Sequence, residues 1–229
     1  MGARALTPGD GYGGYREQLV EALQARGIRD LAVLKAVQEV PRHLFVPEGV
    51  RHRAYEDAAL PIGGGQTISQ PSVQARALEA LALTGRERAL EVGTGSGYQT
   101  ALLARLCENV FSIERQAALM AQARAALALA GVRNVSLLTG DGTLGWRAYA
   151  PWDAIVVSAA FAEVPPPLVE QLAPGGRLVI PLGDVERQAL TLVRRTPAGI
   201  ERTELGDARF VPLLGQHGWR HDPTGRARS

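Results

Sequence analysis

Short apolar runs alternate with amphipathic stretches through the middle of the chain. Runs of three to five mostly apolar residues predict buried strands at 89–92, 110–113, 135–138, 154–158 and 178–180. Between them, apolar residues recur at helical spacing and predict helices at 72–83, 98–107, 116–130 and 166–172. Strands that alternate with helices in this way are typical of a parallel sheet covered on both faces. We therefore predict an α/β fold with a Rossmann-like, doubly wound sheet.

The segment before this core has a different pattern. Apolar residues at helical spacing predict one helix at 16–26, which Gly27 ends, and a second helix that Asp30 caps and Pro41 ends. Prolines and glycines then interrupt the stretch 41–71 repeatedly, which predicts irregular structure. The N-terminal part is therefore expected to be a helical extension followed by loops.

The segment after the core predicts strands without helices between them. Residues 189–195 and 210–214 have the composition of strands, so we expect the sheet to end in an antiparallel edge. A chain of 229 residues is long enough for one such domain, and it shows no linker or internal repeat. The predicted organisation is a flexible N-terminus at 1–14, a single domain at 15–219 and a flexible tail at 220–229. Within the domain we expect a helical and loop extension at 15–71, a core at 72–183 and C-terminal strands at 184–219.

Charge and cysteine content narrow the class of protein. The formal net charge of +2 is too small to indicate a nucleic-acid-binding surface, and the single cysteine, Cys107, excludes an intramolecular disulfide framework. The N-terminus lacks the apolar segment of a signal peptide, and no apolar run approaches the roughly 20 residues that cross a bilayer. We expect a soluble, cytoplasmic monomer that binds neither membranes nor nucleic acid.

A glycine-rich turn follows the first strand of the core. Gly93, Thr94, Gly95, Ser96 and Gly97 lie where that strand passes into its helix. Glycine permits a sharp turn and the close approach of a ligand, and the helix N-terminus offers unpaired N–H groups. The spacing differs from the dinucleotide fingerprint G-x-G-x-x-G, and no lysine follows as in a P-loop. Taken alone, the segment fits a tight structural turn equally well.

Carboxylates follow the next two strands. Glu114 ends the second strand, where it could accept hydrogen bonds from ribose hydroxyls or be an ordinary strand-end carboxylate. Asp141 follows the third strand and could accept from an exocyclic amine, although Gly140-Asp141-Gly142 also fits a β-turn. The carboxyl ends of neighbouring parallel strands converge on one crevice, so these features together predict an adenosyl ligand. No cysteine or histidine spacing indicates a metal site.

The segment Thr67-Ile68-Ser69-Gln70-Pro71 is the most specific part of the sequence. With Pro41-Arg42-His43-Leu44-Phe45-Val46-Pro47 and Ala54-Tyr55-Glu56-Asp57, it closely resembles the protein-L-isoaspartate O-methyltransferase family, and other methyltransferases of this fold do not carry it. The resemblance covers roughly 15–219. It implies a bent seven-stranded sheet, S-adenosylmethionine as cofactor and an L-isoaspartyl carboxylate in damaged proteins or peptides as acceptor. It also implies protein repair, because the ester collapses to a succinimide that hydrolyses in part to normal aspartate.

The resemblance further implies the site residues. Ser69 corresponds to the active-site hydroxyl of the family, and the segment 67–69 would close over the methyl group. Phe161 departs from the family pattern because smaller residues are usual at its position. Leu214 departs from it because some relatives carry a hydroxyl residue there. The implied cofactor contacts are Thr67, Ile68 and Ser69 at the methyl group, Gly93, Thr94, Gly95, Ser96 and Gly97 at the methionine end, Glu114 at the ribose, and Asp141 and Gly142 at the adenine.

The implied reaction suits the residues that are present. A carboxylate with a pKa of about 4 is already ionised at neutral pH, so no general base is required and the lack of a catalytic histidine dyad is no obstacle. We expect the glycines at 63–65 to be a hinge for loop closure and Ser69 to position the acceptor, although Ser69 could instead cap the helix that starts near Ser72. Val211 and Pro212 are candidates for edge pairing with the acceptor peptide, and a plain core strand fits them equally.

Four other functions fit the sequence less well. A nucleic-acid methyltransferase is disfavoured because residues 158–161 are Ser-Ala-Ala-Phe where amino-methylating enzymes carry Asn/Asp-Pro-Pro-aromatic, and a dehydrogenase is disfavoured by the glycine spacing. A small-molecule O-methyltransferase would share the cofactor site, and residues 60–71 argue against it. A non-catalytic protein that kept the fold is disfavoured by the intact glycine turn, Glu114, Asp141 and Ser69.

Overall fold

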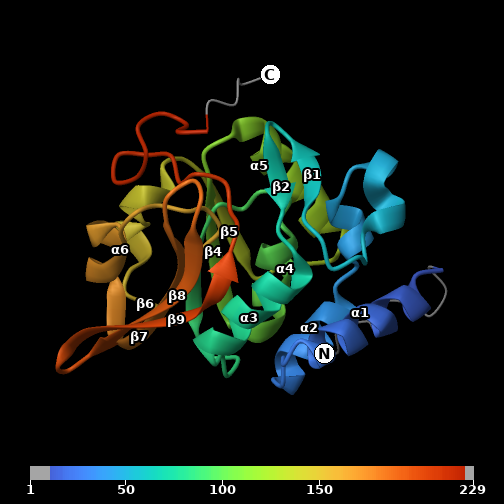
Figure 1. Cartoon of the computed structure of the whole chain (residues 1–229), viewed down its shortest axis with the longest axis horizontal. Coiled ribbons are helices and arrows are strands. Elements are labelled where there is room, and N and C mark those ends of the chain that lie inside the picture. The colour runs from blue at the N-terminus through green and yellow to red at the C-terminus, as the bar shows by residue number, and fades with distance from the viewer. Residues whose placement is uncertain (1–10, 225–229) are drawn as a thin grey trace.

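The computed structural model describes residues 11–224, which form a seven-stranded sheet with helices packed around it (Figure 1). The strands are β3 (Arg88–Val92), β4 (Asn109–Glu114), β5 (Val135–Thr139), β6 (Trp152–Val157), β7 (Leu172–Gly183), β8 (Gln188–Thr196) and β9 (Gly199–Ala208). Their order in the sheet is β5-β4-β3-β6-β7-β8-β9, with parallel pairing from β5 to β7 and antiparallel pairing of β8 with β7 and β9. The predicted Rossmann-like α/β fold with an antiparallel C-terminal edge is confirmed.

Alternate residues of the strands face opposite sides of the sheet and enter two separate hydrophobic clusters. The helices are α1 (Gly13–Ala25), α2 (Leu31–Glu39), α3 (Pro71–Leu81), α4 (Tyr98–Leu106), α5 (Ala117–Leu129) and α6 (Pro166–Glu170). In β3, Ala89 packs among residues of α1 to α5, whereas Leu90 packs with Leu168 of α6 on the other face. The apolar faces of the strands are therefore covered on both sides, as a doubly wound sheet requires.

The stretch 41–71, predicted to be irregular, contains short regular elements. Two 3-10 helices, η1 (Arg42–Phe45) and η2 (Glu48–Arg53), precede a hairpin of β1 (Leu60–Gly63) and β2 (Gln66–Ile68). The hairpin stands apart from the main sheet, next to α5 (Figure 1). Strands of three and four residues are too short to show an alternating pattern, which is why the sequence predicted a loop there.

The strand predicted at 210–214 is wrong. That segment forms only isolated bridges, from Pro212 to Ala160 and from Leu214 to Trp219. Proline cannot donate a ladder hydrogen bond, which limits Pro212 to irregular or edge positions. The last strand of the sheet is instead β9, whose residues are largely exposed and so lack an apolar alternation. Strand β7 is also longer than the predicted 178–180 at both ends, because it runs from Leu172 to Gly183.

The boundary of the predicted flexible N-terminus at 1–14 needs correction, because Gly13 and Gly14 belong to α1. The rest of that prediction for residues 1–10, and the predicted tail at 225–229, lie outside the described residues. Residues 220–224 contain bends and a turn, and Asp222 Oδ1 accepts from Thr224 N at 2.8 Å. Between residues 11 and 224, no helix is long and apolar enough to cross a membrane.

Candidate functional site

The glycine-rich turn lies at the carboxyl end of β3, next to β4 and β6 in the middle of the sheet. Gly93, Gly95 and Gly97 all have positive φ angles, of 93°, 54° and 88°, which L side chains rarely adopt. At Gly93 the N–H donates to the carbonyl of Ile113 at 2.8 Å, so the turn is fixed to the neighbouring strand. The chain therefore bends sharply where β3, β4 and β6 end, and the turn is held in place by its neighbour β4.

Glu114 lies at the carboxyl end of β4, beside that turn, and is only 6% exposed. Its Oε2 accepts from Gly95 N at 3.0 Å, and its Oε1 accepts from Gln116 N at 2.9 Å. Because each carboxylate oxygen has a second acceptor site, the side chain can hold the turn and still accept from a ligand. The predicted convergence of Glu114 with the glycine turn is present.

Asp141 follows β5, and both of its carboxylate oxygens have partners in the protein. Oδ1 accepts from Thr143 N at 2.9 Å and from Thr143 Oγ1 at 2.7 Å, and Oδ2 accepts from Gln216 N at 2.7 Å. These bonds tie the loop after β5 to the C-terminal segment. Gly142 has no room for a side chain, since a Cβ atom there would lie 2.5 Å from Val92 Cγ1.

Ser69 lies directly after β2, between the hairpin and α3. The N-cap of α3 is Gln70, with no side-chain capping bond, and Asp57 Oδ1 accepts from Ser72 N at 2.8 Å instead. Ser69 is therefore not the cap of this helix. Its neighbour Ile68 is buried, whereas Thr67 is exposed.

A cavity of about 820 Å³, counting its open side, joins these features. Nine of the eleven predicted cofactor residues line it; Asp141 and Gly97 do not, and a Cβ atom on Gly97 would lie 3.2 Å from Leu127 of α5. The lining residues that were not predicted belong to no sequence motif, so no signal in the sequence could have identified them. The lining consists of Gln66, Thr67, Ile68, Ser69, Gln74, Val92, Gly93, Thr94, Gly95, Ser96, Gln99, Ile113, Glu114, Arg115, Gln116, Gly142, Ser158, Ala159 and 211–214.

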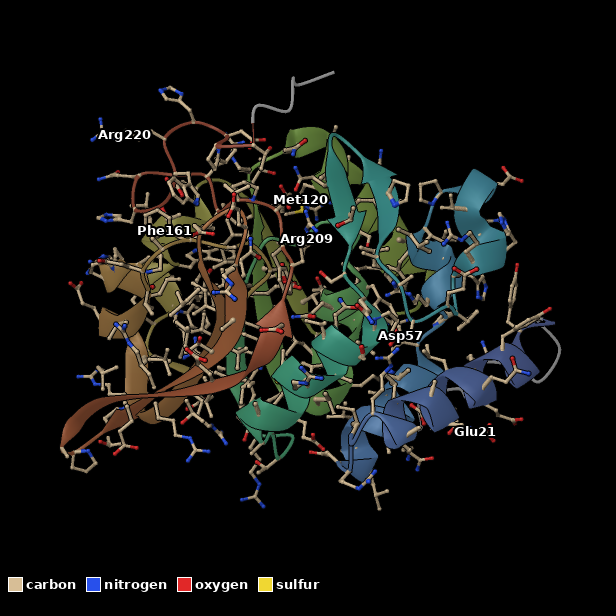
Figure 2. The ribbon with its side chains drawn as sticks, viewed as in Figure 1. Glu21, Asp57, Met120, Phe161, Arg209 and Arg220 are labelled. Carbon is tan, nitrogen blue, oxygen red and sulfur yellow. The ribbon has the colours of Figure 1, made fainter. Side chains whose placement is uncertain are left out.

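A second and larger cavity, of about 1720 Å³ with its open side, adjoins the first. It lies between the hairpin and the C-terminal segment, where Figure 2 shows Arg209. Six residues line both cavities: Gln66, Thr67, Ser69, Val211, Pro212 and Leu214. Of the two departures from the family pattern, Leu214 therefore lies in the site, whereas Phe161 packs its ring edge-on against Trp219 and lines neither cavity.

The segment around Val211 and Pro212 already has hydrogen-bond partners on one edge. Val211 O accepts from Ala160 N at 2.8 Å, and Leu213 N donates to Ala160 O at 2.7 Å. The Gln188 carboxamide accepts from Phe210 N at 2.7 Å and donates to Phe210 O at 3.2 Å. The segment is thus fixed as an ordered wall between the two cavities.

Glu91 lies below the glycine turn in β3, fully buried, and connects three hydroxyl groups. Its Oε2 accepts from Thr100 Oγ1 at 2.5 Å and from Ser112 Oγ at 2.6 Å, and Ser112 Oγ is 2.6 Å from Thr94 Oγ1 in the turn. Burial raises the pKa of Glu91 from 4.5 to about 7, because the charged form is poorly solvated there, and nearby Glu114 adds to the rise. This network supports the turn from behind.

We expect the stability of the protein to fall between about pH 5 and pH 8 because of Glu91. A carboxyl group whose pKa is higher in the folded state favours folding when protonated, and this contribution is lost as the pH rises through the folded-state pKa of about 7. The shift corresponds to a loss on the order of 3 kcal/mol. Thermal unfolding of the wild type and of Glu91→Gln across this range tests it: the variant should show a flatter pH profile. Parallel profiles for the two proteins would contradict the assignment.

Comparisons with known proteins agree on one family. A family model described as Protein-L-isoaspartate(D-aspartate) O-methyltransferase (PCMT) matches residues 14–218. The chain is 51% identical over 205 residues to Protein-L-isoaspartate O-methyltransferase 1 of Syntrophobacter fumaroxidans, covering 89% of this chain and 96% of the relative. It is 57% identical over 204 residues to the protein of that name from Anaeromyxobacter sp., covering 88% and 96%.

Solved structures lead to the same family. A protein-L-isoaspartate O-methyltransferase structure matches with a TM-score of 0.80 and 30% identity, covering 89% of this chain and 67% of that one. A protein-L-isoaspartate O-methyltransferase from Plasmodium falciparum, solved in complex with S-adenosyl-L-homocysteine, matches with a TM-score of 0.75 and 28% identity, covering 87% and 98%. By sequence and by fold, the chain belongs to the protein-L-isoaspartate O-methyltransferase family.

Proposed function

We propose that this chain transfers the methyl group of S-adenosylmethionine to the carboxylate of L-isoaspartyl residues in proteins and peptides, at the junction of its two cavities. One observation supports the location above all: Thr67 and Ser69 line the cavity of the glycine turn and also the larger cavity beside it. A group transferred between a cofactor in the first cavity and a peptide in the second would pass these residues.

The residues of the first cavity suit the cofactor. S-adenosylmethionine supplies a methyl group on a positively charged sulfur, which leaves as a neutral thioether. We assign Gly93, Thr94, Gly95 and Ser96 to the methionine end, because they line the cavity next to the start of α4 and the Ser96 hydroxyl can donate to a carboxylate. Glu114 would accept from the ribose hydroxyls.

We keep Gly142 as a contact of the adenine ring, because it lines the cavity and leaves the ring close access to the backbone. Asp141 could accept from the adenine amine only with the acceptor sites that Thr143 and Gln216 leave free. Gly97 would act through the shape of the turn, since it packs against α5 rather than facing the cavity.

The acceptor needs orientation rather than activation. Its carboxylate is ionised at neutral pH, so no side chain has to remove a proton. We propose that Ser69 donates a hydrogen bond to this carboxylate and that Thr67 and Ile68 help to exclude water. Alignment of two reacting groups can supply up to about 7–11 kcal/mol of the barrier reduction. The ester product collapses to a succinimide, which starts the repair of the damaged residue.

The peptide itself would lie in the larger cavity, along Val211 and Pro212. Edge pairing with this segment is limited, because its backbone bonds to Ala160 and Gln188 occupy much of it. Recognition of the kinked isoaspartyl backbone would then depend on the side chains that line the larger cavity and on the carbonyl group of Pro212. We propose that the enzyme is a monomer, that it works in the cytoplasm and that it binds neither nucleic acid nor membranes.

Two peptides that differ in a single linkage test this function. One carries a normal aspartyl residue, the other an isoaspartyl residue, and both are incubated with the chain and methyl-labelled cofactor. We expect base-labile label on the isoaspartyl peptide alone. Equal labelling of both peptides, or label that is stable to base, would contradict the proposed acceptor.

A further inference from the structure

A buried guanidinium lies directly behind the Ser69 loop. Arg42, the first residue of η1, is 0% exposed. Its Nη2 donates to the carbonyl oxygen of Ser69 at 3.0 Å and, at the longer distance of 3.4 Å, to that of Ala58. Its Nη1 donates to Gln74 Oε1 at 3.1 Å, and Gln74 lines the cofactor cavity. One side chain thus contacts the loop and a wall residue of the cavity.

The same guanidinium also contacts the helix that follows the glycine turn. Its Cζ atom lies 4.7 Å from the centre of the Tyr98 ring, and Tyr98 is the first residue of α4. Burial lowers the pKa of Arg42 to about 10, which still leaves it charged at neutral pH. A buried charge is costly, and an apolar side chain of similar volume often stabilises a fold as well or better. Stability alone therefore gives little reason for an arginine here.

A carboxylate holds the loop from its other end. Asp57 Oδ1 accepts from Ser72 N at 2.8 Å, and its Oδ2 accepts from Gln70 Nε2 at 3.0 Å and from Arg26 Nε at 2.7 Å. Figure 2 shows Asp57 where the N-terminal helices meet the start of α3. Three residues of the segment 69–72, namely Ser69, Gln70 and Ser72, are therefore bonded by one buried cation and one nearly buried anion.

We propose that Arg42 and Asp57 are positioning residues that fix the Ser69 hydroxyl relative to the cofactor cavity. This inference rests on the proposed function, because it concerns how Ser69 meets the acceptor carboxylate. Arg42 bonds the backbone of Ser69 and not its hydroxyl, so its effect on methyl transfer is indirect. The N-terminal extension then serves the reaction by holding the loop, although neither residue lines either cavity.

Arg42→Met and Arg42→Lys test the inference. Because a displacement of about 1 Å in a reacting site can cost roughly 10²-fold in rate, we expect kcat for an isoaspartyl peptide to fall by about that factor in Arg42→Met. Arg42→Lys should recover only part of the loss, since an ammonium lacks the planar fork that serves Ser69 and Gln74 together. The affinity for S-adenosylhomocysteine, measured by calorimetry, should change far less than kcat.

Asp57→Asn tests the contribution of Asp57, because an amide nitrogen in the Oδ2 position can no longer accept from Gln70. We expect a smaller fall in kcat than in Arg42→Met and faster hydrogen exchange of the backbone at 69–72 in both. Arg26→Gln is the matched control: it removes the exposed partner of Asp57 and leaves the loop bonds, so kcat should stay at the wild-type value.

Leu23→Ala separates positioning from general destabilisation. Leu23 is buried in α1 and lines neither cavity. Suppose that Leu23→Ala lowers the thermal midpoint as much as Arg42→Met does, while its kcat per cofactor-binding molecule stays at the wild-type value. The loss of kcat in Arg42→Met then comes from the displaced loop and not from lower stability. Wild-type kcat in a folded Arg42→Met protein, or an equal loss of kcat in Leu23→Ala, would overturn the inference. Failure of the wild type to methylate the isoaspartyl peptide would instead overturn the proposed function, and this inference with it.

Discussion

Ser69→Ala is expected to lower kcat for an isoaspartyl peptide by about 10²-fold while the affinity for S-adenosylhomocysteine stays close to that of the wild type. Removing a single preorganised hydrogen-bond donor from a reacting site costs about 10²- to 10³-fold in kcat. The hydroxyl is proposed to orient the acceptor carboxylate, and the cofactor cavity keeps its glycine turn and Glu114 in this variant. Steady-state kinetics and calorimetry on the same preparation separate the two quantities.

Ser72→Ala is the matched control for this variant. It removes the same hydroxyl group three residues further along, at the start of α3, from a residue that lines neither cavity. The N–H of Ser72, which donates to Asp57, is retained. We expect near wild-type kcat from the control. An equal loss of cofactor affinity and of kcat in Ser69→Ala would count against the assigned role.

Glu114→Ala is expected to weaken S-adenosylhomocysteine binding by about 10²-fold or more. Hydrogen bonds to charged groups contribute about 1.5–3 kcal/mol each, and two bonds to ribose hydroxyls would be lost. A loss of about 3 kcal/mol corresponds to roughly 10²-fold in Kd. The variant also releases the N–H of Gly95, which Glu114 holds at 3.0 Å, so the glycine turn loses a support as well.

Glu108→Gln provides the control for charge. Glu108 is an exposed carboxylate next to the opposite end of β4, so it changes the net charge without reaching the cavity. Calorimetric titration of both variants with S-adenosylhomocysteine should show a large change in Kd only for Glu114→Ala. If its Kd matched the wild type, Glu114 would not be a ribose ligand.

The core of the fold could be predicted because its sequence pattern is strong. Buried parallel strands are almost uniformly apolar, and the runs at 89–92 and 110–113 fall within β3 and β4. Prediction failed where burial leaves no such pattern. Strand β9 is exposed along most of its length, and the segment 210–214 is apolar because it packs between two cavities, not because it belongs to a sheet.

The candidate site was predictable in part for the same reason. Closely spaced glycines and a carboxylate at a strand end can be recognised in a sequence, so the turn at 93–97 and Glu114 could be predicted. Gln74 and Gln99 belong to no recognisable motif, and they reach the cavity only through the packing of α3 and α4. The contact of Arg42 with Ser69 spans 27 positions in the chain and is visible only in the folded structure.

A crystal structure with S-adenosylhomocysteine and an isoaspartyl peptide bound together tests the central claim most directly, because it places donor, acceptor and protein in one frame. We predict that the cofactor sulfur faces the peptide carboxylate at the wall shared by the two cavities, with Ser69 Oγ within hydrogen-bonding distance of that carboxylate and Glu114 bonded to the ribose. A complex in which the carboxylate binds away from Ser69, or in which Glu114 turns away from the sugar, would contradict the account.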